Sequence, residues 1–440
     1  MGWTFVGYAE VNPYACAVLA ARCGATRPKY MPYAEHAYLM DESEGLLARL
    51  NELSRGNGNV VQRYSEQPLD FENLNRFQRV EAYERFHETV WKQAAKELRK
   101  REELLRLHRR TSYEVIGAVP NFGDIWSITD DDLEALGPVD LLEGGSPCQA
   151  FSSAGKEAGL IDFRSALMLA YLDLVERMRR INGLKWVLWE NVKGVLGDNG
   201  NGFGHLLGRL VKERGTAVGR DGLRYANAGY VSGPDGSVAW RVLDSQHFGR
   251  PQRRERVFAL GYVGMGPARR DPRDILFEPV GEGSAAPRKK KPREEAALAL
   301  SGRSAGDVPR SERLAVFMAG QTKAAFSIAE SRTVCPTLRS VSSGSNSVPR
   351  VAYALDEKAG RSADPSVAAP HYVVRKLLPL EAERIQGFED GWTEVQVNGQ
   401  VMPDVPRHAC IGNSMTVDVM RWIGQRLDEA MDAGVEGKAA

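Results

Sequence analysis

Apolar residues in this chain form two kinds of pattern, and the two alternate along the sequence. Short apolar-rich runs, which predict strands, cover residues 3–11, 139–142, 186–192, 239–243 and 257–262. Apolar residues at helical spacing cover residues 13–23, 165–181, 203–214, 380–386 and 417–431. Alternation of strands with helices predicts an α/β fold, with a sheet that carries helices on both faces.

Two stretches interrupt this alternation. Residues 51–115 begin as a polar loop and continue, from about residue 74 to residue 110, as a long helical pattern with a basic end. A solvated charged helix and a phosphate-facing patch both explain that basic end. Residues 264–374 start as a linker rich in Pro, Gly, Lys and Arg and then contain short strand candidates. We therefore expect one domain over residues 1–263 that resumes over 375–440, with 264–374 as a small, irregular inserted domain.

Charge and cysteine content exclude several classes of protein. The 58 basic residues nearly cancel the 57 acidic ones, so attraction to a polyanion depends on local patches. The five cysteines are scattered and none forms a C-x-x-C pair, which argues against a disulfide framework and against a zinc site. No run of eighteen apolar residues and no signal peptide is found, so we expect a cytoplasmic protein with reduced thiols.

The first chemical signal is a cysteine just after a predicted strand. Residues 144–151 read G-G-S-P-C-Q-A-F, so Cys148 follows the 139–142 strand in a turn made of glycines and proline. Open α/β sheets place their chemistry at the carboxyl ends of strands. A buried, inert thiol is the competing interpretation of a free cysteine.

Acidic and basic side chains follow other predicted strands. Glu190 ends the 186–192 strand, and a carboxyl and a thiol at the ends of two central strands would share one crevice. Gln252, Arg254 and Arg256 alternate and therefore lie on one face of an extended segment. Glu10 is either a surface acid or the carboxylate that ends a strand in a nucleotide-binding unit.

The order of these blocks resembles that of the DNA cytosine-5 methyltransferase family. The resemblance rests on six blocks, in this order: residues 144–155 with Pro-Cys-Gln, 162–167, Glu190-Asn191-Val192, Gln252-x-Arg254-x-Arg256, 375–388 (R-K-L-L-P-L-E-A-E-R-I-Q-G-F) and 407–417 (R-H-A-C-I-G-N-S-M-T-V). It covers nearly the whole chain except residues 25–115 and the inserted domain. The family has a Rossmann-like, S-adenosylmethionine-dependent methyltransferase sheet and an inserted target-recognition domain.

The resemblance implies roles for four catalytic residues. The Cys148 thiolate would add to carbon 6 of cytosine, because carbon 5 is a poor nucleophile until an enamine forms. Glu190 would carry a proton near ring nitrogen 3. Arg254 would hold the carbonyl oxygen of the base, and Arg256 would organise the loop around the thiol.

The implied cofactor is S-adenosylmethionine. Carried over one residue at a time, Glu10 would hold the ribose hydroxyls and Val11 would pack on adenine. Asp124 would bond the adenine amino group, with Ile125 alongside. Leu167 would line the pocket, and Asn413 and Ser414 would close it, although G-N-S by itself predicts only a tight turn.

The implied partner is double-stranded DNA, from which the enzyme rotates the target cytosine. Gln149 and Ser152 are candidates to contact the flipped base or its phosphates. Thr337 and Leu338 resemble a dipeptide that lies beside the displaced base, and neighbouring Arg339 could contact a guanine edge or a phosphate. A cognate restriction endonuclease is compatible with this interpretation, and we expect a monomer.

The sequence departs from the family at its start and at Ser146. Family members begin with a strand and a Phe-x-Gly-x-Gly turn for the cofactor, whereas this sequence starts at the equivalent of the second strand. Either Met1 is an internal start codon or the gene product is truncated. A truncated protein that flips cytosine without methylating it is one alternative. A separate alternative is an RNA cytosine-5 methyltransferase that uses the same core. Ser146 replaces the more frequent proline, which we expect to be tolerated.

Overall fold

The computed structural model describes residues 3–31, 99–100, 102–145, 163–198, 201–211, 225–265, 270–277, 315–317, 350–354 and 372–432. Within these ranges the largest element is a five-stranded sheet in the order β3-β4-β7-β6-β5. Its strands are β3 (Leu141–Gly144), β4 (Trp186–Val192), β5 (Ala228–Gly233), β6 (Gly236–Asp244) and β7 (Glu255–Tyr262). β3 runs parallel to β4, and every other pair is antiparallel, so the sheet is mixed.

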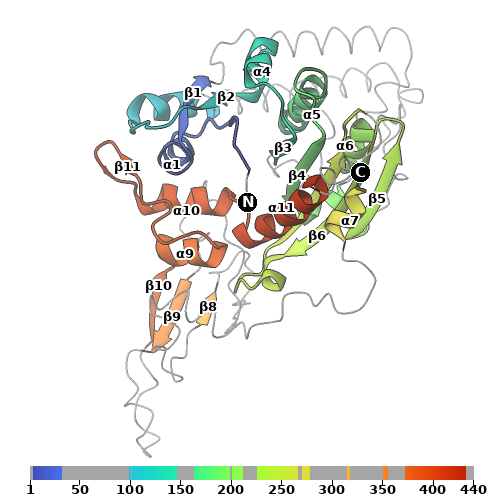
Figure 1. The fold of residues 1–440 in the computed structure, drawn as a ribbon. Coiled ribbons are helices and arrows are strands. Elements are labelled where there is room, and N and C mark those ends of the chain that lie inside the picture. The colour runs from blue at the N-terminus through green and yellow to red at the C-terminus, as the bar shows by residue number, and fades with distance from the viewer. Residues whose placement is uncertain are drawn as a thin grey trace, which may run out of the picture.

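Helices cover both faces of this sheet, as the sequence predicted (Figure 1). On one face α5 (Phe163–Ile181) and α6 (Gly202–Val211) form an apolar core with side chains such as Val187 and Trp189 of β4. On the other face α7 (Pro272–Leu276) and α11 (Val417–Asp432) pack on Trp186, Leu188 and Leu260. Alternate residues of β4 thus enter two different cores, which explains why its sequence is continuously apolar.

A second, two-stranded parallel sheet pairs β1 (Ala25–Tyr30) with β2 (Val119–Gly123). α1 (Pro13–Cys23) precedes it and begins where sequence predicted, because the Asn12 side chain caps the first turn and Pro13 occupies it. The predicted strand over residues 3–11 is reduced to one parallel bridge between Tyr8 and Asn121. β1 was not predicted, because Pro28 and its charged neighbours break the apolar pattern.

The C-terminal part of the described chain is mostly helical. β8 (Ala315–Phe317), β9 (Arg350–Ala354) and β10 (Tyr372–Lys376) form an antiparallel sheet in the order β10-β9-β8. α9 (Pro379–Gln386), the two-residue strands β11 (Gln396–Val397) and β12 (Gln400–Val401), and α10 (Asp404–Asn413) then lead to α11. α10 was not predicted as a helix. Gly412 and Asn413 form its last turn, and Ser414 caps it, in place of an isolated tight turn.

The predicted helix over residues 74–110 is helical where it is described, at residues 99–100 and 102–110. Residues 74–98 lie outside the described ranges. In the described part the basic residues Arg106, Arg109 and Arg110 are exposed, while Leu104, Leu105 and Leu107 are half-buried. No helix in the described ranges is both long and apolar enough to cross a membrane.

Candidate active site at the ends of β3 and β4

The parallel pairing of β3 and β4 brings Glu190 beside the chain that leads to Cys148. Gly144 pairs with Trp189, so the two strands end next to each other. A methyl group built on Gly145 would lie 3.1 Å from the Glu190 carbonyl oxygen and 3.3 Å from Glu190 Oε2. Gly145 precedes Cys148 by only three residues in the sequence. The absence of a side chain at Gly145 therefore lets the chain leave β3 in close contact with the carboxylate.

Cys148 itself lies outside the described residues, and so do the other predicted substrate contacts: Gln149, Ser152, Thr337, Leu338 and Arg339. Their roles stay predictions. The structure describes the ends of β3 and β4, and the sequence predicts the thiol and the acid at these two strand ends.

Glu190 is held in an ion pair with Arg256. Arg256 Nε lies 3.1 Å from Glu190 Oε1, and the two side chains are only 17% and 15% exposed. Burial raises the pKa of the Glu190 carboxyl, while the positive charges of Arg256 and then Arg254 act in the opposite direction. The net pKa is above the ordinary value, which suits a carboxyl that must carry a proton near neutral pH.

Arg254 points to the end of α10. Its Nη2 donates to the carbonyl oxygens of Gly412 at 3.1 Å and Ser414 at 2.7 Å. Gln386 of α9 also donates to the Ser414 carbonyl, at 2.9 Å. Two arginines that are two residues apart thus reach different targets: Arg256 contacts the acid and Arg254 contacts the turn between α10 and α11. The predicted contact of Arg254 with a base stays a prediction.

The predicted cofactor residues Glu10 and Asp124 follow two neighbouring segments of the chain. The buried side-chain amide of Asn121 joins these segments. Asn121, which is 1% exposed, accepts from the backbone N–H of Glu10 at 3.0 Å and of Gly123 at 3.1 Å. Its Nδ2 donates to the Glu10 carbonyl at 3.1 Å. Glu10 and Asp124 therefore follow two adjacent segments that Asn121 holds in register.

The two acids differ in their surroundings. Glu10 accepts from the Asn12 N–H at 2.7 Å, and burial raises the pKa of its carboxyl. Asp124 caps a short 3-10 helix, η2 (Ile125–Ser127), and Ile125 packs on the core under α5. Val11 follows Glu10, and its carbonyl contacts the His108 ring on the basic helix.

The predicted residues from the C-terminal part lie on the same side of the molecule as α1. Cys410 of α10 is close enough to Glu10 for that acid to contribute, after burial, to the raised pKa of its thiol, about 12. Asn413, the last residue of α10, is exposed, and Ser414, which follows it directly, is half-buried. Leu167 lies in α5 and is half-buried. The structure therefore brings α10 to the end of the segment that carries Glu10.

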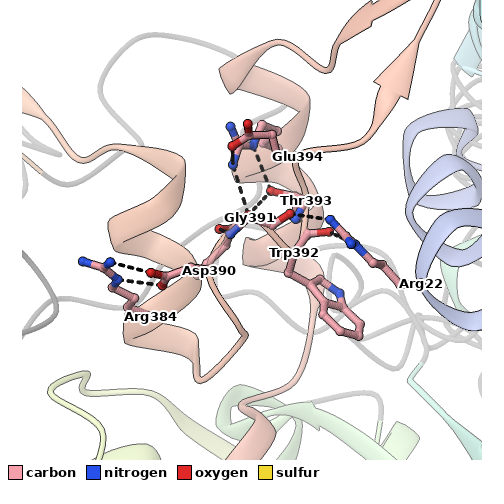
Figure 2. A network of polar contacts seen from close by, with 9 residues as sticks. Arg22, Arg384, Asp390, Gly391, Trp392, Thr393 and Glu394 are labelled. Atoms are coloured by element: carbon pink, nitrogen blue, oxygen red, sulfur yellow. Dashed lines mark hydrogen bonds and ion pairs between the residues drawn. The ribbon is translucent and has the colours of Figure 1, made fainter. Parts of the chain in front are cut away.

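A polar network fixes the loop between α9 and β11 against α1 (Figure 2). Arg22 of α1 donates to the carbonyl oxygens of Trp392 at 2.9 Å and Gly391 at 2.6 Å. The fully buried Glu383 accepts from the N–H groups of Gly391 and Thr393, both at 2.8 Å. Arg407 of α10 pairs with Glu383 at 3.2 Å. This network joins α1, the helix that follows Glu10, to α9 and α10. Asn413 and the Gly412 carbonyl that Arg254 contacts lie in the last turn of α10.

Asn121, Gln386 and Glu383 were not predicted from sequence. Each is a buried polar residue that bonds backbone groups, although Glu383 also pairs with the Arg407 side chain, and backbone partners leave no residue-type signature in the sequence. No group of three or more His, Cys, Asp or Glu side chains that could bind a metal ion occurs in the described ranges.

The described residues thus form an α/β fold in which Glu190 lies beside Gly145 at the ends of two parallel strands, an edge where open α/β sheets place their chemistry. A model of the C-5 cytosine-specific DNA methylase family matches residues 107–429. The chain belongs to this family, whose members are DNA methyltransferases that use S-adenosylmethionine.

Individual relatives carry names that state different amounts about their reaction. A protein of Escherichia phage P1 named DNA N-6-adenine-methyltransferase is 32% identical over an aligned region that covers 72% of this chain and 56% of that protein. Type II methyltransferase M2.BsuMI of Bacillus subtilis (strain 168) is 26% identical over 306 residues, covering 69% and 64%. The chain thus spans less than two thirds of either relative. A crystal structure of S. pombe Dnmt2 methyltransferase is similar at 15% identity, a TM-score of 0.42, and coverage of 72% and 85%.

Proposed function

We propose that this chain transfers the methyl group of S-adenosylmethionine to carbon 5 of a cytosine that has been rotated out of duplex DNA, through a covalent bond to Cys148. The observation that carries the proposal is the position of Glu190. Its carboxyl, with a raised pKa, lies against Gly145 on the path to Cys148. A proton donor and a thiol at one strand end are the two groups that addition to a pyrimidine ring needs.

The Cys148 thiolate forms a bond to carbon 6, and the electron pair of the 5,6 double bond moves through the ring towards nitrogen 3. The Glu190 carboxyl gives its proton to that nitrogen, and Arg256 stabilises the carboxylate that results. Carbon 5 would then take the methyl group as the bond between that group and the donor sulfur breaks. Loss of the carbon 5 proton to water, departure of the Cys148 sulfur and return of the nitrogen 3 proton to Glu190 would restore the aromatic ring, the free thiolate and the protonated carboxyl.

The residues at the other segment ends suit S-adenosylmethionine, which supplies the electrophilic methyl group when bound. Glu10 offers a carboxylate for the ribose hydroxyls, and Asp124 offers an acceptor for the adenine amino group. Val11 and Ile125 offer apolar contacts for the ring. Asn413 and Ser414 would close the site, and Arg254 would hold their turn in place through its contacts with Gly412 and Ser414.

DNA contacts would come from the inserted domain and from the segment after Cys148. Residues 264–374 would recognise the target sequence, with Thr337, Leu338 and Arg339 beside the displaced base, and Gln149 and Ser152 would contact the base or its phosphates. The exposed basic side chains of residues 106–110 offer a further contact for phosphates. We propose a monomer that acts on double-stranded DNA, with or without a cognate restriction endonuclease.

The decisive experiment measures both the product and the bond. The purified chain is incubated with unmethylated genomic DNA and isotopically labelled S-adenosylmethionine, and the nucleosides are separated by mass spectrometry. We expect label in 5-methylcytosine. Label in N6-methyladenine, which the name of the phage P1 relative makes the specific alternative, would overturn the proposal.

A second measurement tests the role of the thiol. Once the methylated sequence is known, a duplex with 5-fluorocytosine at that position should trap the enzyme covalently in the presence of the donor. Cys148→Ala should remove both the trap and the activity, whereas the control Cys23→Ala should keep both. DNA binding without any transfer would instead support the non-methylating alternative, and transfer to RNA alone would support the RNA enzyme.

A further inference from the structure

Glu143 is a second carboxyl on the strand next to Glu190. In the parallel register of β3 and β4, Glu143 pairs with Leu188, so the two side chains leave the sheet on the same face. Leu188 and Glu190 share a face as well, because they are two residues apart on one strand. Glu143 and Glu190 are therefore diagonal neighbours on one face, the face that packs under α11.

The Glu190 carboxylate lies towards the strand that carries Glu143. Its Oε2 is the atom that a methyl group on Gly145 would meet at 3.3 Å, and Gly145 is two residues after Glu143 on the same segment. Diagonal neighbours in a sheet are about 7–8 Å apart at Cα, a distance at which two carboxylates interact strongly when protein surrounds them.

Positive charges lie on the β7 side of this pair, next to Glu190. On β7, Arg256 forms its ion pair with Glu190, and Arg254 contributes a second positive charge to Glu190. On β3, Glu143 lies beside the Glu190 carboxylate, whose negative charge acts on it. On the opposite face the Tyr171 hydroxyl of α5 lies 3.5 Å and 3.4 Å from the carbonyl oxygens of Leu142 and Leu188, which keeps it beneath the two strands.

The proton affinity of Glu143 agrees with this arrangement. Solvent reaches the side chain, yet the surrounding protein, and after it the Glu190 carboxylate, raise the pKa of Glu143 to about 7. The pKa of Glu190 is also above its ordinary value, in spite of Arg256. Two interacting carboxyls of this kind titrate as a pair.

We propose that Glu143 is a positioning residue for the reaction: it sits diagonally across β3 and β4 from Glu190 and, by its negative charge, keeps a proton on the pair that Glu190 then presents to the pyrimidine ring. Arg256 against Glu190 favours the ionised carboxylate, and Glu143 acts against it. The two side chains together set the pH at which Glu190 loses its proton. This role rests on the proposed function, since it concerns the proton that methyl transfer uses.

Removal of the Glu143 charge has a definite sign. Glu143→Gln removes a like charge, so the pKa of Glu190 falls and the carboxyl ionises at lower pH. The alkaline limb of the pH profile of kcat/KM should therefore move to lower pH, by about one unit, so that the rate above that limb falls about tenfold. Asp140→Asn is the matched control. It removes one negative charge just before the same strand, where Asp140 pairs with the exposed Lys185, and it should leave the profile unchanged.

A direct titration separates this inference from the proposed function. The protein is labelled with ¹³C at the glutamate side-chain carboxyls, and resonances are assigned with Glu143→Gln and Glu190→Gln. In the wild type we expect the Glu143 resonance to titrate near pH 7. Glu190→Gln should lower that midpoint, and Glu143→Gln should lower the midpoint of Glu190, because coupling is reciprocal.

These outcomes can be interpreted even if the chain methylates no DNA, and the wild-type titration does not depend on any variant folding. A Glu143 midpoint near 4.5 in the wild type would overturn the proposal. So would a Glu190 midpoint that does not move in Glu143→Gln. A shift in the titration without a shift in the activity profile would remove Glu143 from the reaction and leave only the electrostatic coupling.

Discussion

Arg256 and Glu190 form an ion pair that opposes the effect of burial on the acid. The 3.1 Å contact links β7 to the end of β4 and holds the carboxyl on the side where the chain departs towards Cys148. The balance between the guanidinium and burial decides how readily Glu190 gives up a proton.

Arg256→Met should move the alkaline limb of the activity profile to higher pH. The guanidinium lowers the pKa of Glu190, so its removal lets burial raise that pKa further. This direction is opposite to that expected for Glu143→Gln. Single-turnover rates measured across pH values test it, with Arg241→Met on β6 as a control. A limb that moves to lower pH would contradict the assignment of Glu190 as the titrating group.

Gly145→Ala should reduce activity, whereas Gly144→Ala should reduce stability. A methyl group on Gly145 would press on Glu190, so we expect at least a tenfold loss of activity with little change in melting temperature. A methyl group on Gly144 would lie 2.8 Å from the buried Tyr171 ring on the other face, so we expect a loss of about 1–3 kcal/mol of folding free energy. Chemical denaturation and methyl-transfer assays on both variants test the contrast, and equal effects on activity would refute it.

Asn121→Ala should weaken both the fold and cofactor binding. It leaves the buried backbone groups of Glu10 and Gly123 without their partner, which costs about 1–3 kcal/mol of stability. The matched control is Asn182→Ala, a buried asparagine that donates to the carbonyl oxygens of Leu133 and Gly137. Both variants should lose stability, but only Asn121→Ala should raise the Kd for S-adenosylmethionine in calorimetric titrations. Equal affinities would contradict the role given to Glu10 and Asp124.

Glu383→Ala should be among the most destabilising single changes in the C-terminal helices. It leaves the guanidinium of Arg407, which is 6% exposed, without its buried acid, a loss of about 3–5 kcal/mol. The double variant Glu383→Met with Arg407→Met should recover most of that loss, because no buried charge is then left alone. Asp390→Asn, at the exposed pair with Arg384, should cost about 1 kcal/mol or less. Urea denaturation of the variants gives the comparison.

The sequence predicted the order of elements well, because apolar spacing is a local property. α1, α5, α6, β4, β7, α9 and α11 lie within a few residues of their predicted positions. The failures have physical causes. The segment over residues 3–11 has an apolar pattern but pairs only at Tyr8, and strand formation depends on a partner that the pattern does not encode. α10 has few apolar residues at helical spacing and is held by Arg407 and Arg254.

In the candidate site, too, local features could be predicted from the sequence and long-range contacts could not. The placement of Glu190 at a strand end and its proximity to the Cys148 segment could be predicted, because parallel strands bring their carboxyl ends together. The different targets of Arg254 and Arg256 could not be predicted. Arg254 contacts carbonyl groups that are 158 and 160 residues away, and backbone acceptors carry no sequence signal. Glu143 also drew no attention in the sequence, since its importance depends on the register between two strands.

α11, the last helix described in the chain, packs on one face of the five-stranded sheet. Val419, Ile423 and Leu427 of α11 pack on side chains of β4 and β7, although the whole of residues 263–416 separates that helix from β7. During synthesis the part of this apolar face that α7 does not cover stays exposed until the ribosome has made all of those residues. Production of the active protein should therefore depend on slow translation or on a chaperone that shields this surface until the last helix arrives.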